Sequence, residues 1–203
     1  MKKTFLTAFA ALLVAIPAVQ AQKVNKSGLL TKIEKSDADI ADAKKNAKAS
    51  TWINRGKALY EAAVEPTKSL FVNMDAAMLK LAVGEPKSAS KETLNGVEYD
   101  AWVYNYFTAY VKDNKVVTWK QTKWVMKDAP EKAIEAYNKA YELDPKTADK
   151  VKEGLKQVSD FCSQVGNTGI DTGNYVEAAK AYETAYKAQS SPAYGEADPA
   201  LLY

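Results

Sequence analysis

The residue types that carry most enzyme chemistry are scarce in this 203-residue sequence. It has no histidine, which excludes Ser-His-Asp and Cys-His nucleophile pairs, histidine-ligated zinc and the usual near-neutral general base. Its single cysteine, Cys162, excludes an internal disulfide, and the apolar residues around it predict a buried thiol. Glycine-rich phosphate loops, nucleophile elbows and metal-ligand spacings are also lacking. We therefore expect no catalytic residue, no metal site and no cofactor.

Carboxylates are the remaining groups that could catalyse a reaction, because two of them suffice for glycoside hydrolysis. Asp37, Asp39 and Asp42 stand among lysines, which is typical of a solvated helix face. No pair of carboxylates is set apart in a way that would shift its pKa values. An enzyme is therefore less favoured than an interaction scaffold or a ligand-binding module.

Aromatic residues form a second group with chemical potential, and they recur at even positions of one segment. Rings with polar tips suit protein contacts or stacking on sugar rings. The candidate binding residues of this segment are Trp102, Tyr104, Tyr106 and Tyr110. The alternative is that neighbouring helices cover both faces of the segment, because exposed apolar patches are uncommon on monomers.

The segment that carries these aromatics has the period-two pattern of β-strands. Val, Ala and Phe recur at odd positions through 97–111, which predicts a face packed on helices. Asn95-Gly96 predicts a hairpin turn because both residues tolerate positive φ, and Asp113-Asn114 predicts a second turn. Asn105 interrupts the apolar face and marks a place where the alternation shifts, as at a bulge. We expect an antiparallel meander of about three strands within 89–124.

The residues before this segment have the spacing of helices. Apolar residues from Leu29 to Ala47 predict one amphipathic helix, and a second begins near Lys48 and runs to Ala63. A third helix is expected from Pro66 until Gly84 stops it. Its apolar stripe comprises Leu70, Phe71, Met74, Met78 and Leu81. Short turns between the three helices predict antiparallel packing.

Helices return after the β segment. Asp128 and Glu131 have the spacing of a capping box, with Pro130 in the first turn, where its missing N–H costs little. Asp144-Pro145 repeats this logic and predicts the start of the next helix.

Two helices in this part of the chain share a spacing of small and aromatic residues. Small residues let two helices approach closely, while the aromatic fills the groove opposite. One set is Ala133, Tyr137, Ala140 and Pro145, and the other is Ala178, Tyr182, Ala185 and Pro192, with Gly166 before it. The pattern resembles the tetratricopeptide repeat family, in which a helix with a small residue at the crossing precedes a helix reading Ala, aromatic, Ala, Pro.

The resemblance is good for 159–192 and for 130–145, although Cys162 and Gly169 stand where the family prefers Trp and Tyr. The interval from Ala133 to Ala178 is 45 residues instead of the usual 34. The helix after Pro145 is therefore expected to be about three turns longer than usual.

Trp52-x3-Gly56 resembles the first helix of another repeat. The helix that follows it lacks the alanine pattern, so this repeat is expected to be degenerate.

The resemblance implies that partner proteins or peptides bind on the concave face formed by the first helices of each pair. Asn167 matches the asparagine of those repeats that clamp the terminal carboxylate of a peptide. Ser163 replaces the lysine expected four residues earlier, and without that charge a clamp is disfavoured. The alternative for Asn167 is a solvated helix residue.

The N-terminus has the pattern of a secretory signal peptide. Met1-Lys2-Lys3 is followed by an apolar run through Val19 and by the small-x-small ending Val19-Gln20-Ala21. Cleavage after Ala21 would remove Lys2 and Lys3, so the net charge would fall from +3 to +1. That charge gives no electrostatic case for nucleic acid or an anionic membrane. The residue directly after the cleavage point is Gln22, and not the cysteine that is acylated in a bacterial lipoprotein.

Together these patterns predict a mainly α protein, a tetratricopeptide-like α-solenoid of antiparallel helix pairs with a small β-meander insertion. Its expected parts are the signal peptide 1–21, N-terminal helices with a degenerate pair 22–88, the insertion 89–124, and helix pairs 125–203 in an array continuing past the last residue. The expected function is a non-catalytic scaffold for envelope proteins or peptides, in the periplasm, at the outer membrane or secreted. The alternative is a module in which the aromatic insertion binds carbohydrate or peptidoglycan.

Overall fold

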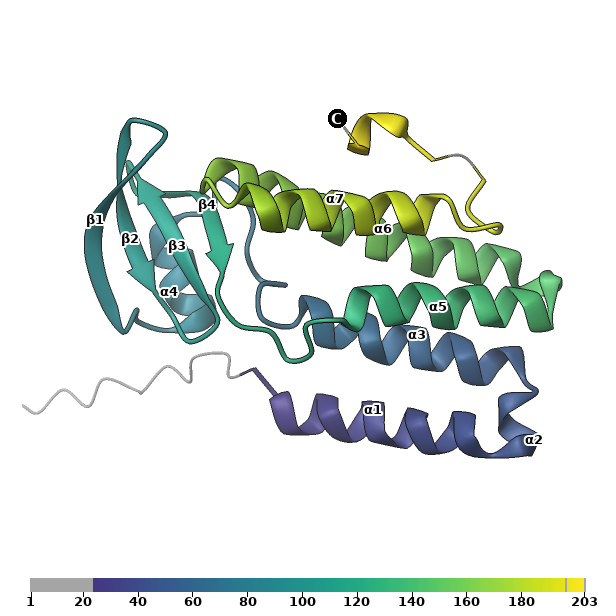
Figure 1. The fold of residues 1–203 in the computed structure, drawn as a ribbon. Coiled ribbons are helices and arrows are strands. Elements are labelled where there is room, and N and C mark those ends of the chain that lie inside the picture. The colour runs from purple at the N-terminus through teal and green to yellow at the C-terminus, as the bar shows by residue number, and fades with distance from the viewer. Residues whose placement is uncertain (1–23, 196, 203) are drawn as a thin grey trace, which may run out of the picture.

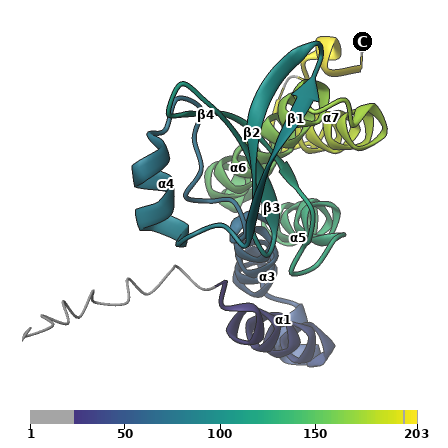
Figure 2. The same cartoon turned by 90° about the vertical axis from the view of Figure 1, so that its left-hand side faces the viewer.

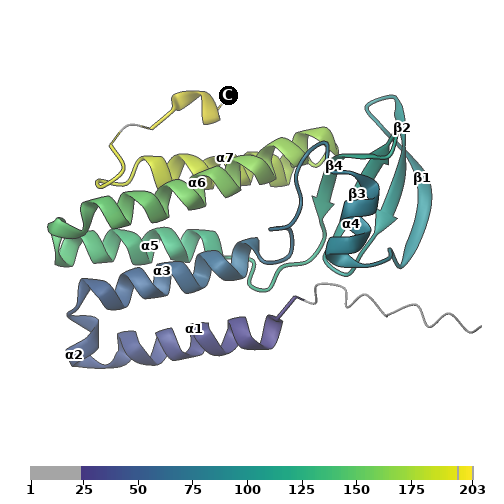
Figure 3. The ribbon, with the colours of Figure 1, turned by 180° about the vertical axis from the view of Figure 1, so that it is seen from behind.

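A computed structural model describes residues 24–195 and 197–202 (Figure 1). In these residues it has seven α-helices, two 3₁₀ turns and a four-stranded antiparallel sheet. Most of the helices lie side by side, and the sheet stands across one end of them with the short helix α4, as Figure 3 also shows from behind. The expected signal peptide, 1–21, lies outside the described residues.

The helices outside the sheet region pack on one another in chain order. Contacts join α1 to α3, α3 to α5, α5 to α6 and α6 to α7. Their bounds are α1 Lys26–Ala41, α2 Ala43–Asn46, α3 Ala49–Val64, α5 Ala129–Leu143, α6 Ala148–Asp171 and α7 Tyr175–Gln189.

The first helix is shorter than expected, because the chain breaks at Asp42. The Asp42 carboxylate accepts from the backbone N–H groups of Lys44 and Lys45, both at 2.9 Å, and so starts α2. The Trp52 indole N–H then donates to the carbonyl of Asn46 at 2.9 Å. This bond holds the short α2 against the start of α3.

The helix expected from Pro66 until Gly84 forms only in its second half, as α4, Ala76–Val83. Asn73 has a positive φ of 67°, and the backbone around it pairs with the edge of the sheet. The N–H of Asn73 donates to the carbonyl of Val116, and the N–H of Val116 donates to that of Met74, both at 2.8 Å. Backbone groups used in this way are lost to a helix.

The expected stripe is wrong for the same reason. Leu70 and Met74 are buried, but Phe71, Met78 and Leu81 are exposed. Instead of joining the N-terminal helices, α4 packs its Leu79 side on the sheet (Figure 2).

The sheet has one strand more than expected, in the order β1-β2-β3-β4. Its strands are β1 Ser88–Leu94, β2 Val97–Val103, β3 Phe107–Lys112 and β4 Lys115–Gln121. Both expected turns are confirmed, because Asn95, Gly96, Asp113 and Asn114 all have positive φ. The extra turn lies at Asn105, where the Tyr104 N–H donates to the Phe107 carbonyl at 2.8 Å. The interrupted alternation at Asn105 therefore marks a reversal of the chain and not a bulge.

The two tyrosine-bearing helices make equivalent contacts with the helix before each of them. The Tyr137 ring of α5 lies against Gly56 of α3, and the Tyr182 ring of α7 lies against Gly166 of α6. A Cβ atom on Gly56 would come within 2.7 Å of the first ring, and one on Gly166 within 2.6 Å of the second. Both pairs therefore depend on a glycine at the crossing.

The partner of α3 corrects the expectation of a degenerate pair. The second helix of this pair is α5, which carries Ala133, Tyr137 and Ala140, all fully buried. It is separated from α3 by residues 65–128, which contain α4 and the whole sheet. The insertion therefore interrupts a helix pair between its two helices, and the alanine pattern is found only beyond it.

The predicted long helix is confirmed, because α6 has 24 residues whereas α5 and α7 have 15 each. Before α6, Asp144 accepts from the N–H of Lys146 at 3.1 Å and starts the 3₁₀ turn η1, Pro145–Thr147. The capping box at Asp128 is wrong. The ψ angle of Asp128 is 15°, outside the extended region that a capping side chain needs, and its carboxylate pairs with Lys132 at 2.8 Å instead.

The buried side chains form two cores. The larger core lies among the helices and includes Leu59, Tyr137 and Leu155. The smaller core lies between α4 and the sheet and includes Leu79, Val116 and Trp119. The insertion therefore has an apolar core of its own.

Replacing Gly56 or Gly166 by alanine should destabilise the protein. The added methyl group meets the buried ring of Tyr137 at Gly56 or the partly buried ring of Tyr182 at Gly166. Overpacking of this kind costs about 1–3 kcal/mol. This cost exceeds the roughly 1 kcal/mol that alanine gains over glycine in a helix interior. Urea denaturation of Gly56→Ala, with the exposed neighbour Lys57→Ala as control, measures the change. A rise in unfolding free energy for Gly56→Ala would show that the ring does not press on the helix.

Candidate functional site

A groove runs between α3 and α6, the first helices of the two pairs. The side chains of Tyr60 and Val64 line it from α3, and a third wall comes from the segment that follows α3. The side chains from α6 are Gln157, Asp160, Phe161 and Gln164, and those of the third wall are Thr67, Lys68 and Leu70. The groove has a volume of about 500 Å³. This is in the range of pockets that take a ligand or a short peptide segment.

The regular spacing on α6 explains why its side chains face the groove together. Gln157, Asp160 and Gln164 are three and four residues apart, so they occupy one stripe of the helix. Tyr60 lies across the groove from them, one turn before Val64 on α3. The long α6 therefore presents a polar stripe where the chain turns toward the insertion.

Charged groups of the groove are neutralised within the protein. The Asp160 carboxylate pairs with Lys156 at 2.7 Å, and Lys68 pairs with Glu65 at 2.8 Å. In contrast, the amides of Gln157 and Gln164 and the hydroxyl of Tyr60 have no hydrogen-bond partner in the described part of the chain. The groove thus offers neutral donors and acceptors, which match the amides of an extended peptide backbone.

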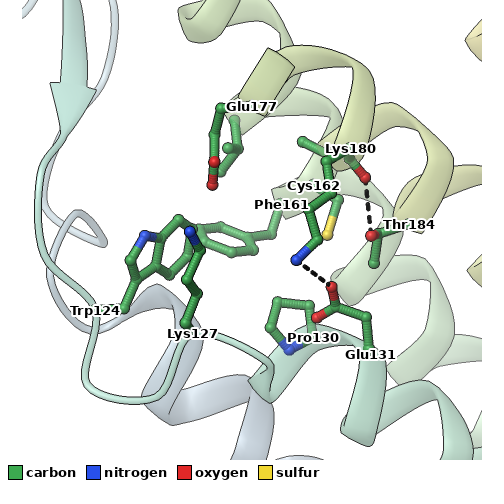
Figure 4. Close-up of a pocket in the computed structure, with 11 residues that line it drawn as sticks. Trp124, Lys127, Pro130, Glu131, Phe161, Cys162, Glu177, Lys180 and Thr184 are labelled. Atoms are coloured by element: carbon green, nitrogen blue, oxygen red, sulfur yellow. Dashed lines mark hydrogen bonds and ion pairs between the residues drawn. The ribbon is translucent and has the colours of Figure 1, made fainter. Parts of the chain in front are cut away.

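A second, much smaller hollow lies where α5, α6 and α7 meet (Figure 4). The Glu131 carboxylate pairs with Lys180 at 3.3 Å across it, and the Thr184 hydroxyl donates to the Lys180 carbonyl at 2.9 Å. At its base the rings of Trp124 and Phe161 meet edge to face at 6.2 Å. Its volume of about 30 Å³ has room for only about two water molecules. This hollow is a packing seam between helices.

Cys162 lies in the wall of this seam. Its side chain is buried, as expected from its apolar neighbours. Burial raises the pKa of the Cys162 thiol from 9.0 to about 12, and the Glu131 carboxylate adds to the rise. The thiol is therefore protonated and unreactive at neutral pH.

The aromatic residues expected on one face of the β segment are divided between different surroundings. Trp102 pairs with Ala109 and faces α4, where the Lys80 ammonium lies 4.9 Å from its ring. Tyr110 pairs with Ala101 on the other face, and its buried hydroxyl donates to Glu92 at 3.1 Å.

Tyr104 and Tyr106 belong to neither strand, because they lie in the turn between β2 and β3. The expectation of a single aromatic face is therefore wrong. The cause is the reversal at Asn105, which places Tyr110 on a different strand from Trp102.

Asn167 is exposed on α6 and supports the repeat packing. Its side-chain oxygen accepts from the Tyr182 hydroxyl at 2.6 Å, the ring that lies on Gly166. It lines neither the groove nor the seam. Its observed contact is thus with the neighbouring helix of its own pair.

The groove residues Tyr60, Gln157 and Gln164 were not identified from the sequence. One signal was available, because Gln157 and Gln164 lie two turns apart on a helix predicted to be unusually long. Glutamine has no distinctive pattern on a solvated helix, however, and Tyr60 is placed only by the pairing of α3 with α5.

Within residues 24–195 and 197–202, acidic and cysteine side chains nowhere gather in a group that could hold a metal ion. Over the same residues, no helix combines the length and apolarity needed to cross a membrane.

Comparison with known protein families gives a match to a repeat family. Residues 128–147 match the model of the tetratricopeptide repeat. They cover the whole of α5 and the turn after it, including Ala133, Tyr137, Ala140 and Pro145. The match supports a tetratricopeptide repeat protein, consistent with the two glycine–tyrosine contacts. Comparisons with curated proteins and with solved structures gave no match.

The buried thiol gives a testable pH dependence. Because the pKa of Cys162 is about 12 in the folded state and near 9.0 when exposed, its effect on stability is complete below pH 9 and is lost as pH rises toward 12. Between pH 8 and 10 the unfolding free energy of the wild type should fall by about 1 kcal/mol relative to Cys162→Ala. Urea titrations at both pH values measure this difference. An unchanged difference, or rapid thiol modification of the native protein at pH 8, would contradict a buried thiol.

Proposed function

We propose that this chain is a non-catalytic scaffold that holds an extended segment of a partner protein in the groove between α3 and α6. The observation that carries the proposal is that the amides of Gln157 and Gln164, which have no hydrogen-bond partner among the described residues, face Tyr60 across the groove. The tetratricopeptide match supports it, because proteins with such repeats serve as interaction scaffolds.

The geometry favours recognition of a peptide backbone over recognition of a charged end. A carboxylate clamp needs a cation free to pair with the bound anion. In the groove Lys68 is already paired with Glu65, and Ser163 and Asn167 are absent from its lining. A neutral stretch of extended chain, with side chains alternating toward Phe161 and Val64, matches the mixture of polar and apolar walls.

We also propose that the protein is exported and acts in the cell envelope or outside the cell. The support is the N-terminal sequence, with its basic start, apolar run and small-x-small ending at Ala21. The partners are then envelope proteins or peptides, bound without a cofactor and without catalysis. Carbohydrate binding by Trp102, Tyr104, Tyr106 and Tyr110 as one surface is not retained, because these residues do not share a face.

The groove can be tested with a display library of random 12-residue peptides panned on the purified protein. Selected peptides, resynthesised with an amidated C-terminus, should bind the wild type, because backbone amides and not a terminal carboxylate are recognised. The double substitution Gln157→Ala with Gln164→Ala should weaken binding about tenfold, at about 0.5–1.5 kcal/mol for each hydrogen bond lost. Fluorescence anisotropy measures the affinities.

The matched control is Asn167→Ala, on the same helix but outside the groove, which should leave peptide affinity unchanged. Three outcomes would overturn the groove proposal. These are that no peptide is enriched, that amidation of the peptide abolishes binding, or that the double substitution leaves the peptide affinity unchanged.

Export makes a separate prediction. When the full gene is expressed in a Gram-negative host, the mature protein should begin at Gln22. Edman sequencing or intact mass of the protein recovered from the periplasm or medium measures this. A protein that retains Met1 and remains in the cytoplasm would contradict export, whatever the result for the groove.

A further inference from the structure

A third hollow opens where the insertion joins the helices, on the other side of the segment that walls the groove. Pro66 and Ser69 of that segment face it, and Thr67, Lys68 and Leu70 face the groove. Its other walls are the connection between α4 and β1, with Glu85 and Lys87, and the turn between β2 and β3, with Tyr104, Asn105, Tyr106 and Phe107. Its volume is about 540 Å³. We call it the junction pocket.

The junction pocket contains a buried polar atom without a partner. Tyr104 is only 8% exposed, and its hydroxyl makes no hydrogen bond within the described residues. Its ring is held in place by stacking on Phe107, with the ring centroids 4.8 Å apart. A buried hydroxyl without a hydrogen-bond partner is unfavourable. A ligand that accepts a hydrogen bond from it therefore removes this cost.

Burial and the nearby Glu85 carboxylate both raise the pKa of Tyr104, so the hydroxyl keeps its proton and can donate it. Tyr104 and Glu85 both line the junction pocket, so the ring and this carboxylate border the same space.

The charges around the pocket leave a positive excess. Glu65 pairs with Lys68 at 2.8 Å, and Glu85 pairs with Lys80 at 2.9 Å. Lys87 and Lys123 also line the pocket, and neither forms an ion pair with any other described residue. An anionic ligand therefore finds two uncommitted ammonium groups at the rim.

The ring of Tyr106 gives the pocket an apolar surface. It is partly exposed, and its backbone is fixed because its carbonyl accepts from the N–H groups of Thr122 at 2.7 Å and Lys123 at 3.1 Å. Asn105 beside it is exposed, with a side-chain amide that makes no hydrogen bond in the described chain. A flat apolar ring, a free amide, a hydroxyl and two cations match a sugar ring that has an apolar face, hydroxyl groups and an acid.

We propose that the junction pocket binds a sugar that carries a carboxylate, such as a uronic acid unit of a polysaccharide. The sugar ring packs on Tyr106, a sugar oxygen accepts from the Tyr104 hydroxyl, and Lys87 and Lys123 supply the counter-charge. The proposal does not depend on the peptide groove, because the two hollows have no lining residue in common.

Saturation-transfer NMR of the purified protein tests this with three soluble trisaccharides, namely trigalacturonic acid, maltotriose and chitotriose. Trigalacturonic acid should bind at least threefold more tightly than either neutral sugar at low salt, and binding should weaken in 0.5 M NaCl. Absence of binding by all three sugars would overturn the proposal. Preference for a neutral sugar would overturn it as well, because the two lysines would then play no part.

Three variants of the pocket residues, with one control outside the pocket, separate the contributions. Tyr106→Ala should abolish the signal, and Lys87→Ala with Lys123→Ala should remove the preference for the acidic sugar. Tyr104→Phe should weaken binding roughly 2- to 10-fold while leaving the thermal midpoint unchanged or higher, since it deletes a hydroxyl without a partner in the described part of the protein. This opposite effect on binding and stability distinguishes a ligand contact from a structural role. The control Tyr175→Ala, at an exposed ring on α7, should change neither, and sugar binding unaffected by the pocket variants would overturn the site.

Discussion

The architecture depends on one repeated contact, a tyrosine ring pressed against a glycine on the neighbouring helix. Tyr137 makes this contact twice, because its ring also lies against Gly154 at the start of α6. Three helices therefore meet at one fully buried side chain. Because glycine has no Cβ atom, the helix backbones can approach closely at each crossing, and the tyrosine ring fills the space between them. The pairing of α3 with α5, across the inserted residues, is fixed by this contact.

The sequence predicted the features that depend on local chemistry. The turns at Asn95-Gly96 and Asp113-Asn114 follow from residues that tolerate positive φ, and the long α6 follows from the spacing of Ala133 and Ala178. The helix predicted from Pro66 failed because its backbone groups bond to β4, which lies about forty residues later in the chain. No local pattern contains that information. The pairing of α3 with α5 is not predictable for a related reason, since the short turns between the N-terminal helices favour packing of helices that are consecutive in the sequence.

The candidate site was less predictable than the fold. Aromatic residues are conspicuous in a sequence, yet Tyr110 is buried with a partner, and Trp102 packs toward α4. Gln157 and Gln164 are of an ordinary residue type, and what sets them apart is that their amides make no hydrogen bond within residues 24–195 and 197–202. Such a property appears only when every neighbour is in place. The segment from Pro66 to Leu70 has the same character, because Pro66 and Ser69 line one hollow and its other residues line a second.

The insertion enters at the bend of a helix hairpin, and this position has a consequence for how the protein is put together. Because α3 and α5 run in opposite directions, the end of one and the start of the other lie at the same end of the pair (Figure 1). The chain thus leaves and re-enters the helical layer at neighbouring points. A guest module placed there is tolerated at little entropic cost, since loop-closure entropy grows only slowly with length. The host hairpin and its guest are accordingly free to diverge, so that one repeat architecture can acquire a new recognition surface while its own packing stays intact.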